Sequence, residues 1–175
     1  EWGFNPWVQY FASRNYAVLQ PQYRGSTGYG IKHEEAGYKK WGAEMQDDIT
    51  DGILHLIDKG IVDKSRVCIV GASYGGYAAA WGLVKTPDLY RCGISINGVL
   101  SLTKNAAEIE GLLFSDLNRQ LFNDKDKLTQ FSPYYNAKKV KSPLLLIASK
   151  KDAVVPYTHS KSMYKKMKKL KKDVE

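Results

Sequence analysis

The residues best suited to carry out a reaction are 71–75, which read Gly-Ala-Ser-Tyr-Gly. A serine in a Gly-x-Ser-x-Gly pattern can act as a nucleophile when it lies at a sharp turn from a strand into a helix, where its hydroxyl is exposed. The flanking residues fit such a turn. Val67–Val70 is apolar throughout, as in a parallel strand covered on both faces, and Ala78–Ala80 favours a helix.

The glycines of this segment predict that the strand and the helix pack closely around Ser73. Gly71, Gly75 and Gly76 lack the side chains that would keep the two elements apart. The pattern alone is not specific, since it arises by chance in about one chain in twenty of this length. The alternative interpretation is a structural turn that carries an incidental serine.

A serine nucleophile needs a base that takes its proton and an acid that orients the base. In α/β hydrolases these residues follow in the order Ser, Asp, His. Asp152 comes just after the apolar run Leu144–Ala148. Because active-site groups gather at the carboxyl ends of parallel strands, Asp152 is the natural acid. An aspartate after a strand is also common in purely structural turns.

The elements that must position these residues alternate between strands and helices. This alternation predicts a parallel α/β sheet flanked by helices. Strands are expected at 16–20, 66–70, 93–97 and 144–148, and helices at 5–14, 41–59, 74–85 and, less regularly, through Ile109, Leu112, Leu113, Leu117 and Leu121. A basic amphipathic helix is expected around Met163–Leu170.

The glycine-rich loop Tyr23–Gly30 could be taken for a phosphate-binding loop, but it lacks the required residues. A Walker loop from Gly25 would need lysine at Ile31, and a dinucleotide fingerprint from Gly28 would need glycine at His33. We therefore expect a structural turn. The carboxylates of the helix that follows are expected to be solvated or to complement the helix dipole: Glu44, Asp47, Asp48 and Asp51.

The formal net charge of +8 is local rather than general. Residues 161–175 hold seven lysines and two carboxylates, so the other residues carry only +3. Since no arginine-rich or aromatic readout elements accompany these lysines, no nucleic-acid partner is expected. No apolar run approaches the length of a membrane span, so no membrane partner is expected either. Cys68 and Cys92 are interpreted as small buried hydrophobic residues without a disulfide.

Four segments together resemble the prolyl oligopeptidase family of serine peptidases: Tyr23–Gly30, Gly71–Tyr77, Pro87–Tyr90, and Asp152 with Val155–Pro156. The resemblance implies an α/β-hydrolase fold, a peptide substrate, and chemistry without a metal or cofactor. It implies that Ser73 is the nucleophile, that Asp152 is the acid, and that the backbone N–H of Tyr74 is one oxyanion donor. Ala148–Ser149 departs from the His-Gly pair usual in the family, but that pair is not catalytic.

The same resemblance implies that the fold is incomplete at both ends. Residues 1–175 would be a partial catalytic domain, with the catalytic histidine beyond Glu175 and the second oxyanion element before Glu1. A strand between 16–20 and 66–70 and a propeller domain would also be missing. Of the three histidines, His159 lies seven residues after Asp152 and is too close to it to reach Ser73 as well.

Substrate selection is expected to involve the segment after strand 93–97. Val99, Leu102 and Phe114 are the apolar candidates for its substrate-binding wall, although each could equally be ordinary core. Three other functions remain open at this point: an esterase on the same fold, a catalytically silent fragment, and a basic nucleic-acid-binding domain.

Overall fold

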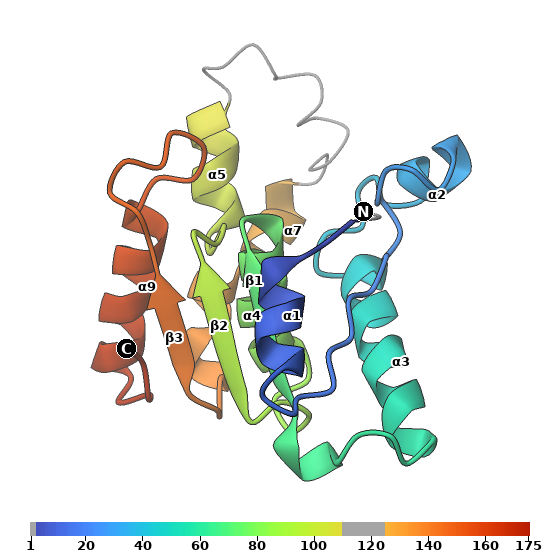
Figure 1. Ribbon diagram of the computed structural model, residues 1–175. Coiled ribbons are helices and arrows are strands. Elements are labelled where there is room, and N and C mark those ends of the chain that lie inside the picture. Colours follow the sequence, from blue (N-terminus) through green and yellow to red (C-terminus); the bar gives the residue numbers. More distant parts are fainter. Residues whose placement is uncertain (1–2, 110–124) are drawn as a thin grey trace. The chain divides into compact units, whose positions relative to one another are not determined.

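The computed structural model describes residues 3–109 and 125–175. The chain divides into two compact units, Glu1–Lys64 and Ser65–Glu175, and each unit is described by itself (Figure 1). That residues 1–175 belong to one catalytic domain stays a prediction. Over the described residues no helix combines the length and the apolar character needed to cross a membrane.

The first unit contains the helices α1 (Pro6–Ala12), α2 (Ile31–Glu35) and α3 (Glu44–Asp58). Helix α1 begins after Asn5, whose Oδ1 accepts hydrogen bonds from the N–H groups of Trp7 and Val8 at 3.0 and 3.2 Å. Helix α3 ends just before Gly60, which has a φ of +69°. The helices predicted at 5–14 and 41–59 are thus confirmed with shorter bounds.

The prediction of a strand at 16–20 is wrong. These residues form no ladder, and no described segment of the chain pairs with them. A strand requires a hydrogen-bonded neighbour, and the sequence pattern supplies only the apolar residues that would face one. The alternation of residue types therefore predicted an extended segment but not its partner.

The glycine-rich loop is a structural turn that is held by an ion pair. The Arg24 guanidinium binds both carboxylate oxygens of Asp48, at 2.8 Å from Nε and 2.6 Å from Nη2, and the Arg24 backbone N–H adds a third bond. Gly25 and Gly37 approach so closely that a Cβ on Gly37 would lie 2.4 Å from the Gly25 Cα. Asp48 is therefore not merely solvated, and the expectation for that residue is wrong.

Replacing Asp48 tests this ion pair. The hydrogen bonds from Arg24 lower the pKa of Asp48 below its ordinary value of 3.8. The pair therefore stabilises the fold above the pKa of the unfolded carboxyl group, and this contribution is lost as the pH falls through the folded-state pKa. We expect Asp48→Asn to lower the free energy of unfolding by about 1 kcal/mol at neutral pH.

Urea titrations of the wild type and of Asp48→Asn from neutral to acidic pH measure the difference in stability, which should shrink as the pH falls through the folded-state pKa of Asp48. The matched control is Asp51→Asn on the exposed side of the same helix, which should change nothing. A difference between Asp48→Asn and wild type that persisted in acid would contradict the assignment.

The second unit is built on a parallel sheet of three strands in the order β1 (Cys68–Ala72), β2 (Cys92–Ile96) and β3 (Leu144–Ile147). Its described helices are α4 (Tyr74–Lys85), α5 (Leu102–Ile109), α7 (Lys125–Gln130), α8 (Pro133–Asn136) and α9 (Thr158–Lys169), with a short 3-10 turn at Ala137–Lys139. Another 3-10 turn, Lys64–Arg66, spans the boundary between the two units. The predicted parallel α/β sheet is confirmed. The helix predicted through Ile109–Leu121 falls almost entirely outside the described residues.

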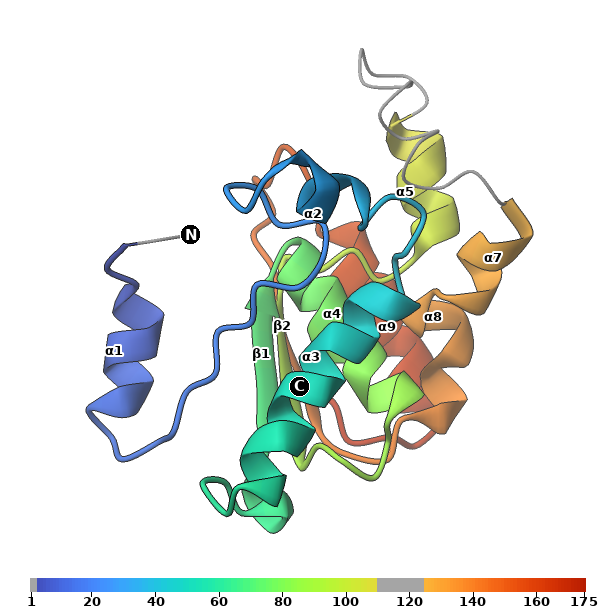
Figure 2. The ribbon, with the colours of Figure 1, turned by 90° about the vertical axis from the view of Figure 1, so that its right-hand side faces the viewer.

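The helices α4, α8 and α9 lie on one side of this sheet (Figure 2). The core lies on that side, where Tyr77 is fully buried and stacks on Trp81 with ring centroids 6.4 Å apart. The opposite face carries the apolar residues Val70 and Ile147, and α4, α8 and α9 do not cover it (Figure 2). That the first strand is covered on both faces stays a prediction.

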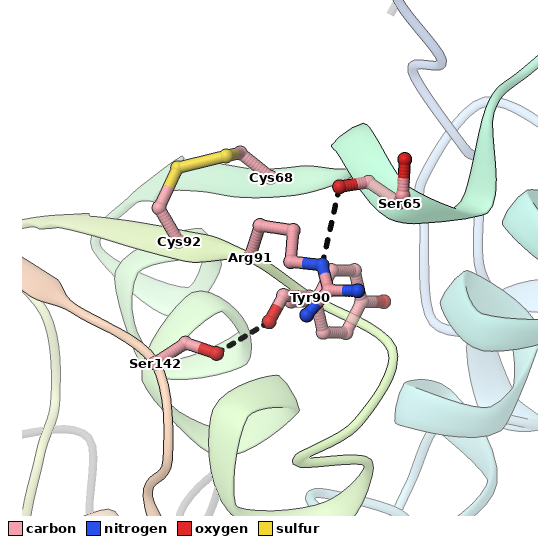
Figure 3. The surroundings of a disulfide bond; sticks show 6 residues. All are labelled: Ser65, Cys68, Tyr90, Arg91, Cys92 and Ser142. Atoms are coloured by element: carbon pink, nitrogen blue, oxygen red, sulfur yellow. Dashed lines mark hydrogen bonds between the residues drawn. A yellow bond between two sulfur atoms is a disulfide. The ribbon is translucent and has the colours of Figure 1, made fainter.

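Cys68 and Cys92 form a disulfide bond, contrary to the prediction (Figure 3). The two residues are direct neighbours across the β1–β2 pair, with Cα atoms 4.7 Å apart. Their sequence separation of 24 gave no sign of this, because the contact is created by the sheet register. Beside the disulfide, Arg91 Nε donates to Ser65 O, and Ser142 Oγ donates to Tyr90 O.

Candidate active site

Ser73 lies at the turn from β1 into α4, as predicted. Its backbone has φ +54° and ψ −117°, a conformation that non-glycine residues rarely adopt. The residue is exposed. A strained, exposed serine between a strand and a helix is the geometry of a nucleophile elbow.

Close backbone approach holds this turn in place. A Cβ on Gly71 would lie 2.3 Å from the carbonyl oxygen of Gly75, and one on Gly76 would lie 2.8 Å from the Cα of Gly98. Both glycines are therefore required, as predicted. At Gly75 a Cβ would meet nothing within 4 Å, so the expectation that Gly75 itself must lack a side chain is wrong.

The two neighbouring glycines of α4 make a matched test of this packing. Gly76→Ala forces its Cβ against backbone atoms that cannot give way, and we expect a loss of about 1 to 3 kcal/mol in the free energy of unfolding. Gly75→Ala enters open space within a helix and should be neutral or stabilising by up to about 1 kcal/mol. Urea unfolding of both variants measures the contrast. Equal stability of the two would show that the close approach is not what holds the elbow.

A chain of hydrogen bonds joins the elbow to the ends of the other two strands. The Ser73 N–H donates to Ile96 O at 2.9 Å, and the Asn97 N–H donates to Ile147 O at 2.8 Å. The Asn97 side chain then accepts from the N–H of Ser149 at 2.8 Å. The carboxyl ends of β1, β2 and β3 are thereby locked together.

Sequence reasoning missed Asn97. This residue has a φ of +46°, in the left-handed region that asparagine tolerates better than most residues. An asparagine followed by Gly98 directly after a strand was the available signal. It predicts a turn, but it does not predict that the amide reaches a different strand.

Asp152 lies in the loop after β3. Its Oδ1 accepts from the N–H groups of Val154 at 2.8 Å and Val155 at 2.9 Å. These two bonds, that from Val155 foremost, hold the pKa of Asp152 below its ordinary value. Asp152 is thus a preoriented, ionised carboxylate, and Oδ2 is engaged by no other residue in the described part of the chain.

Ser73 and Asp152 lie at the same edge of the sheet, because each follows a strand and all three strands run parallel. No histidine within the described ranges hydrogen-bonds either residue. His33 Nε2 contacts Tyr23 O at 3.1 Å, and His55 is exposed on α3. His159 is 2% exposed and accepts hydrogen bonds from the loop after β2.

Of the other predicted site residues, Tyr74, Val99 and Leu102 lie in the described part of the chain. Tyr74 is the first residue of α4, and its role as oxyanion donor stays a prediction. Val99 and Leu102 are 5% and 1% exposed and lie in the interior after β2. Their assignment to a substrate-binding wall also stays a prediction. Phe114 lies outside the described residues.

The sequence profile described as "Prolyl oligopeptidase family" matches residues 2–175 of the chain. The chain belongs to this family. It is 33% identical over 174 residues to "Dipeptidyl aminopeptidase BIII" of Pseudoxanthomonas mexicana, covering 95% of the chain and 25% of that protein. It is 27% identical over 166 residues to "Acylamino-acid-releasing enzyme" of Arabidopsis thaliana, covering 89% of the chain and 22% of that protein.

Solved structures agree with this membership of the prolyl oligopeptidase family. An acylaminoacyl peptidase of Pyrococcus horikoshii superposes with a TM-score of 0.88 at 32% identity, over 98% of this chain and 28% of that one. The α/β-hydrolase fold is thereby confirmed. The chain spans about a quarter of the length of the relatives it matches.

Proposed function

We propose that the complete protein is a serine peptidase that hydrolyses peptide or acyl-peptide bonds through an acyl-enzyme on Ser73. The observation that carries the proposal is the left-handed backbone of Ser73 at a strand-to-helix turn that Gly71 and Gly76 hold by close approach. Membership of the prolyl oligopeptidase family and similarity to proteins named as peptidases support it.

In the proposed reaction Ser73 Oγ attacks the carbonyl carbon of the substrate while a histidine takes its proton. The C–N bond then breaks, the histidine returns the proton to the leaving amine, and water cleaves the acyl-enzyme by the same steps. The N–H of Tyr74 stabilises the oxyanion. Asp152 holds the imidazole through Oδ2, because its Oδ1 is occupied by the backbone of its own loop.

The last residues of the chain support a histidine that approaches from the β3 side. Leu144 pairs in parallel with Val174, and Glu175 exchanges backbone hydrogen bonds with Leu144 and Leu146. A strand that continues in this direction ends at the edge that carries Ser73 and Asp152. A histidine in the loop after that strand would therefore reach both residues.

Access to the site is proposed to depend on a further domain. The relatives are about four times as long as this chain, and we infer that a propeller domain limits the size of the substrate in the complete protein. Val99, Leu102 and Phe114 would contribute to the wall around the substrate side chain.

The first test is Ser73→Ala in the complete protein. We expect hydrolysis to fall roughly 10⁶-fold with the fold intact, because the turn depends on glycines rather than on the hydroxyl. A fluorophosphonate probe should label the wild type at Ser73 and leave the variant unlabelled, as read by peptide mass spectrometry. A matched panel of peptides and p-nitrophenyl esters distinguishes a peptidase from an esterase, and near-normal hydrolysis by the alanine variant would refute the proposal.

The second test is Asp152→Asn. The amide preserves the shape of the loop but holds the catalytic imidazole in the wrong tautomer, so turnover should fall roughly 10⁴-fold. Asp88→Asn is the control, since Asp88 is an exposed carboxylate paired with Lys141. If Asp152→Asn lost less than about tenfold in turnover, another carboxylate would have to be the acid.

A further inference from the structure

His159 is a buried ionisable residue that the proposed mechanism does not use. It lies in the first turn of α9, and its side chain is almost inaccessible, at 2% exposure. Its Nδ1 accepts hydrogen bonds from the backbone N–H groups of Leu100 at 3.2 Å and Ser101 at 3.3 Å. Since Nδ1 is an acceptor, the network assigns the ring proton to Nε2.

The two donors belong to the buried segment between β2 and α5. Leu100 is fully buried and Ser101 is 7% exposed, so neither N–H can turn to solvent. Other bonds hold the same segment: Leu100 O accepts from the Tyr134 N–H at 2.9 Å, and the Leu102 N–H donates to Ser132 Oγ at 2.8 Å. His159 adds a hydrogen bond to this segment from α9, beside the bond that Ser149 in the loop after β3 donates to Asn97.

This segment lies between the two catalytic residues of the proposed triad. At its start, Gly98 packs against Gly76, in the first turn of the helix that follows Ser73. On the other side, α9 is the element into which the Asp152 loop runs. A shift of the segment relative to α9 therefore changes the placement of Ser73 relative to Asp152.

We propose that His159 is a positioning residue, whose Nδ1 holds the segment after β2 against the acid loop and so keeps Ser73 and Asp152 aligned. The proposal rests on the proposed serine peptidase function. It assigns no proton transfer to His159, because its Nδ1 is committed to the backbone.

The test compares two amide replacements in the complete protein. In His159→Asn the Oδ1 is attached to Cγ, as the imidazole Nδ1 is in the wild type, so both hydrogen bonds can form. In His159→Gln the oxygen lies one carbon farther out. We expect kcat to stay within about threefold of wild type for Asn and to fall about 10- to 100-fold for Gln, with KM little changed, because the alignment of reacting groups is lost.

Hydrogen exchange at the Leu100 and Ser101 amides gives a readout independent of catalysis, and it should be at least about tenfold faster in the Gln variant than in the Asn variant. The control pair His55→Asn and His55→Gln, at an exposed position of α3, should match wild type in every measurement.

The outcomes separate this proposal from the proposed function. Equal kcat in the Asn and Gln variants overturns the positioning role, and so does a Gln variant that fails to fold while the Asn variant folds. If the wild type does not react at Ser73, the serine peptidase proposal fails. Unequal amide exchange would then still support the His159 contact, and equal exchange would overturn the contact too.

Discussion

The close approach of backbone around Ser73 is the constraint on which the rest of the site depends. Because Gly71 and Gly76 carry no Cβ, β1, α4 and the loop after β2 can meet at distances that side chains would prevent. That contact forces the left-handed conformation of Ser73 and leaves its side chain exposed. The strained turn leads directly into the buried segment 76–84 of α4, which holds the turn in place.

The acid side of the site is organised by hydrogen bonds rather than by packing. Asn97 joins the end of β2 to Ser149, and the backbone of the next loop holds one oxygen of Asp152 and favours its ionised form. His159 adds a buried bond from the following helix to the segment after β2. The Asn97 and His159 contacts cross between elements, so the relative position of Ser73 and Asp152 depends on the whole sheet edge.

Two features of the sheet lie away from the packing of α4. Its β3 edge is extended by residues 173–175 in parallel orientation, and its face opposite α4 carries the apolar residues Val70 and Ile147. Both features fit a chain that spans about a quarter of the length of its relatives. The described residues hold an exposed serine at a strand-to-helix turn and a preoriented carboxylate, and the proposed catalysis requires a base at the same edge.

The sequence by itself determined the local elements and their order. The apolar run before Ser73, the glycines at 71 and 76, and the position of Asp152 after a strand were enough to predict the elbow, the parallel sheet and the edge that carries both residues. These features depend on backbone preferences and on the direction of parallel strands, which are encoded within short segments.

Only the tertiary structure decided which residues meet across the chain. It paired Cys68 with Cys92 through the sheet register and Arg24 with Asp48 across 24 residues, and among the described residues it gave 16–20 no partner strand. It also showed that a side chain fits at Gly75 but not at Gly76. Each of these outcomes depends on the distance between segments that are remote in sequence, and residue type alone carries no information about that distance.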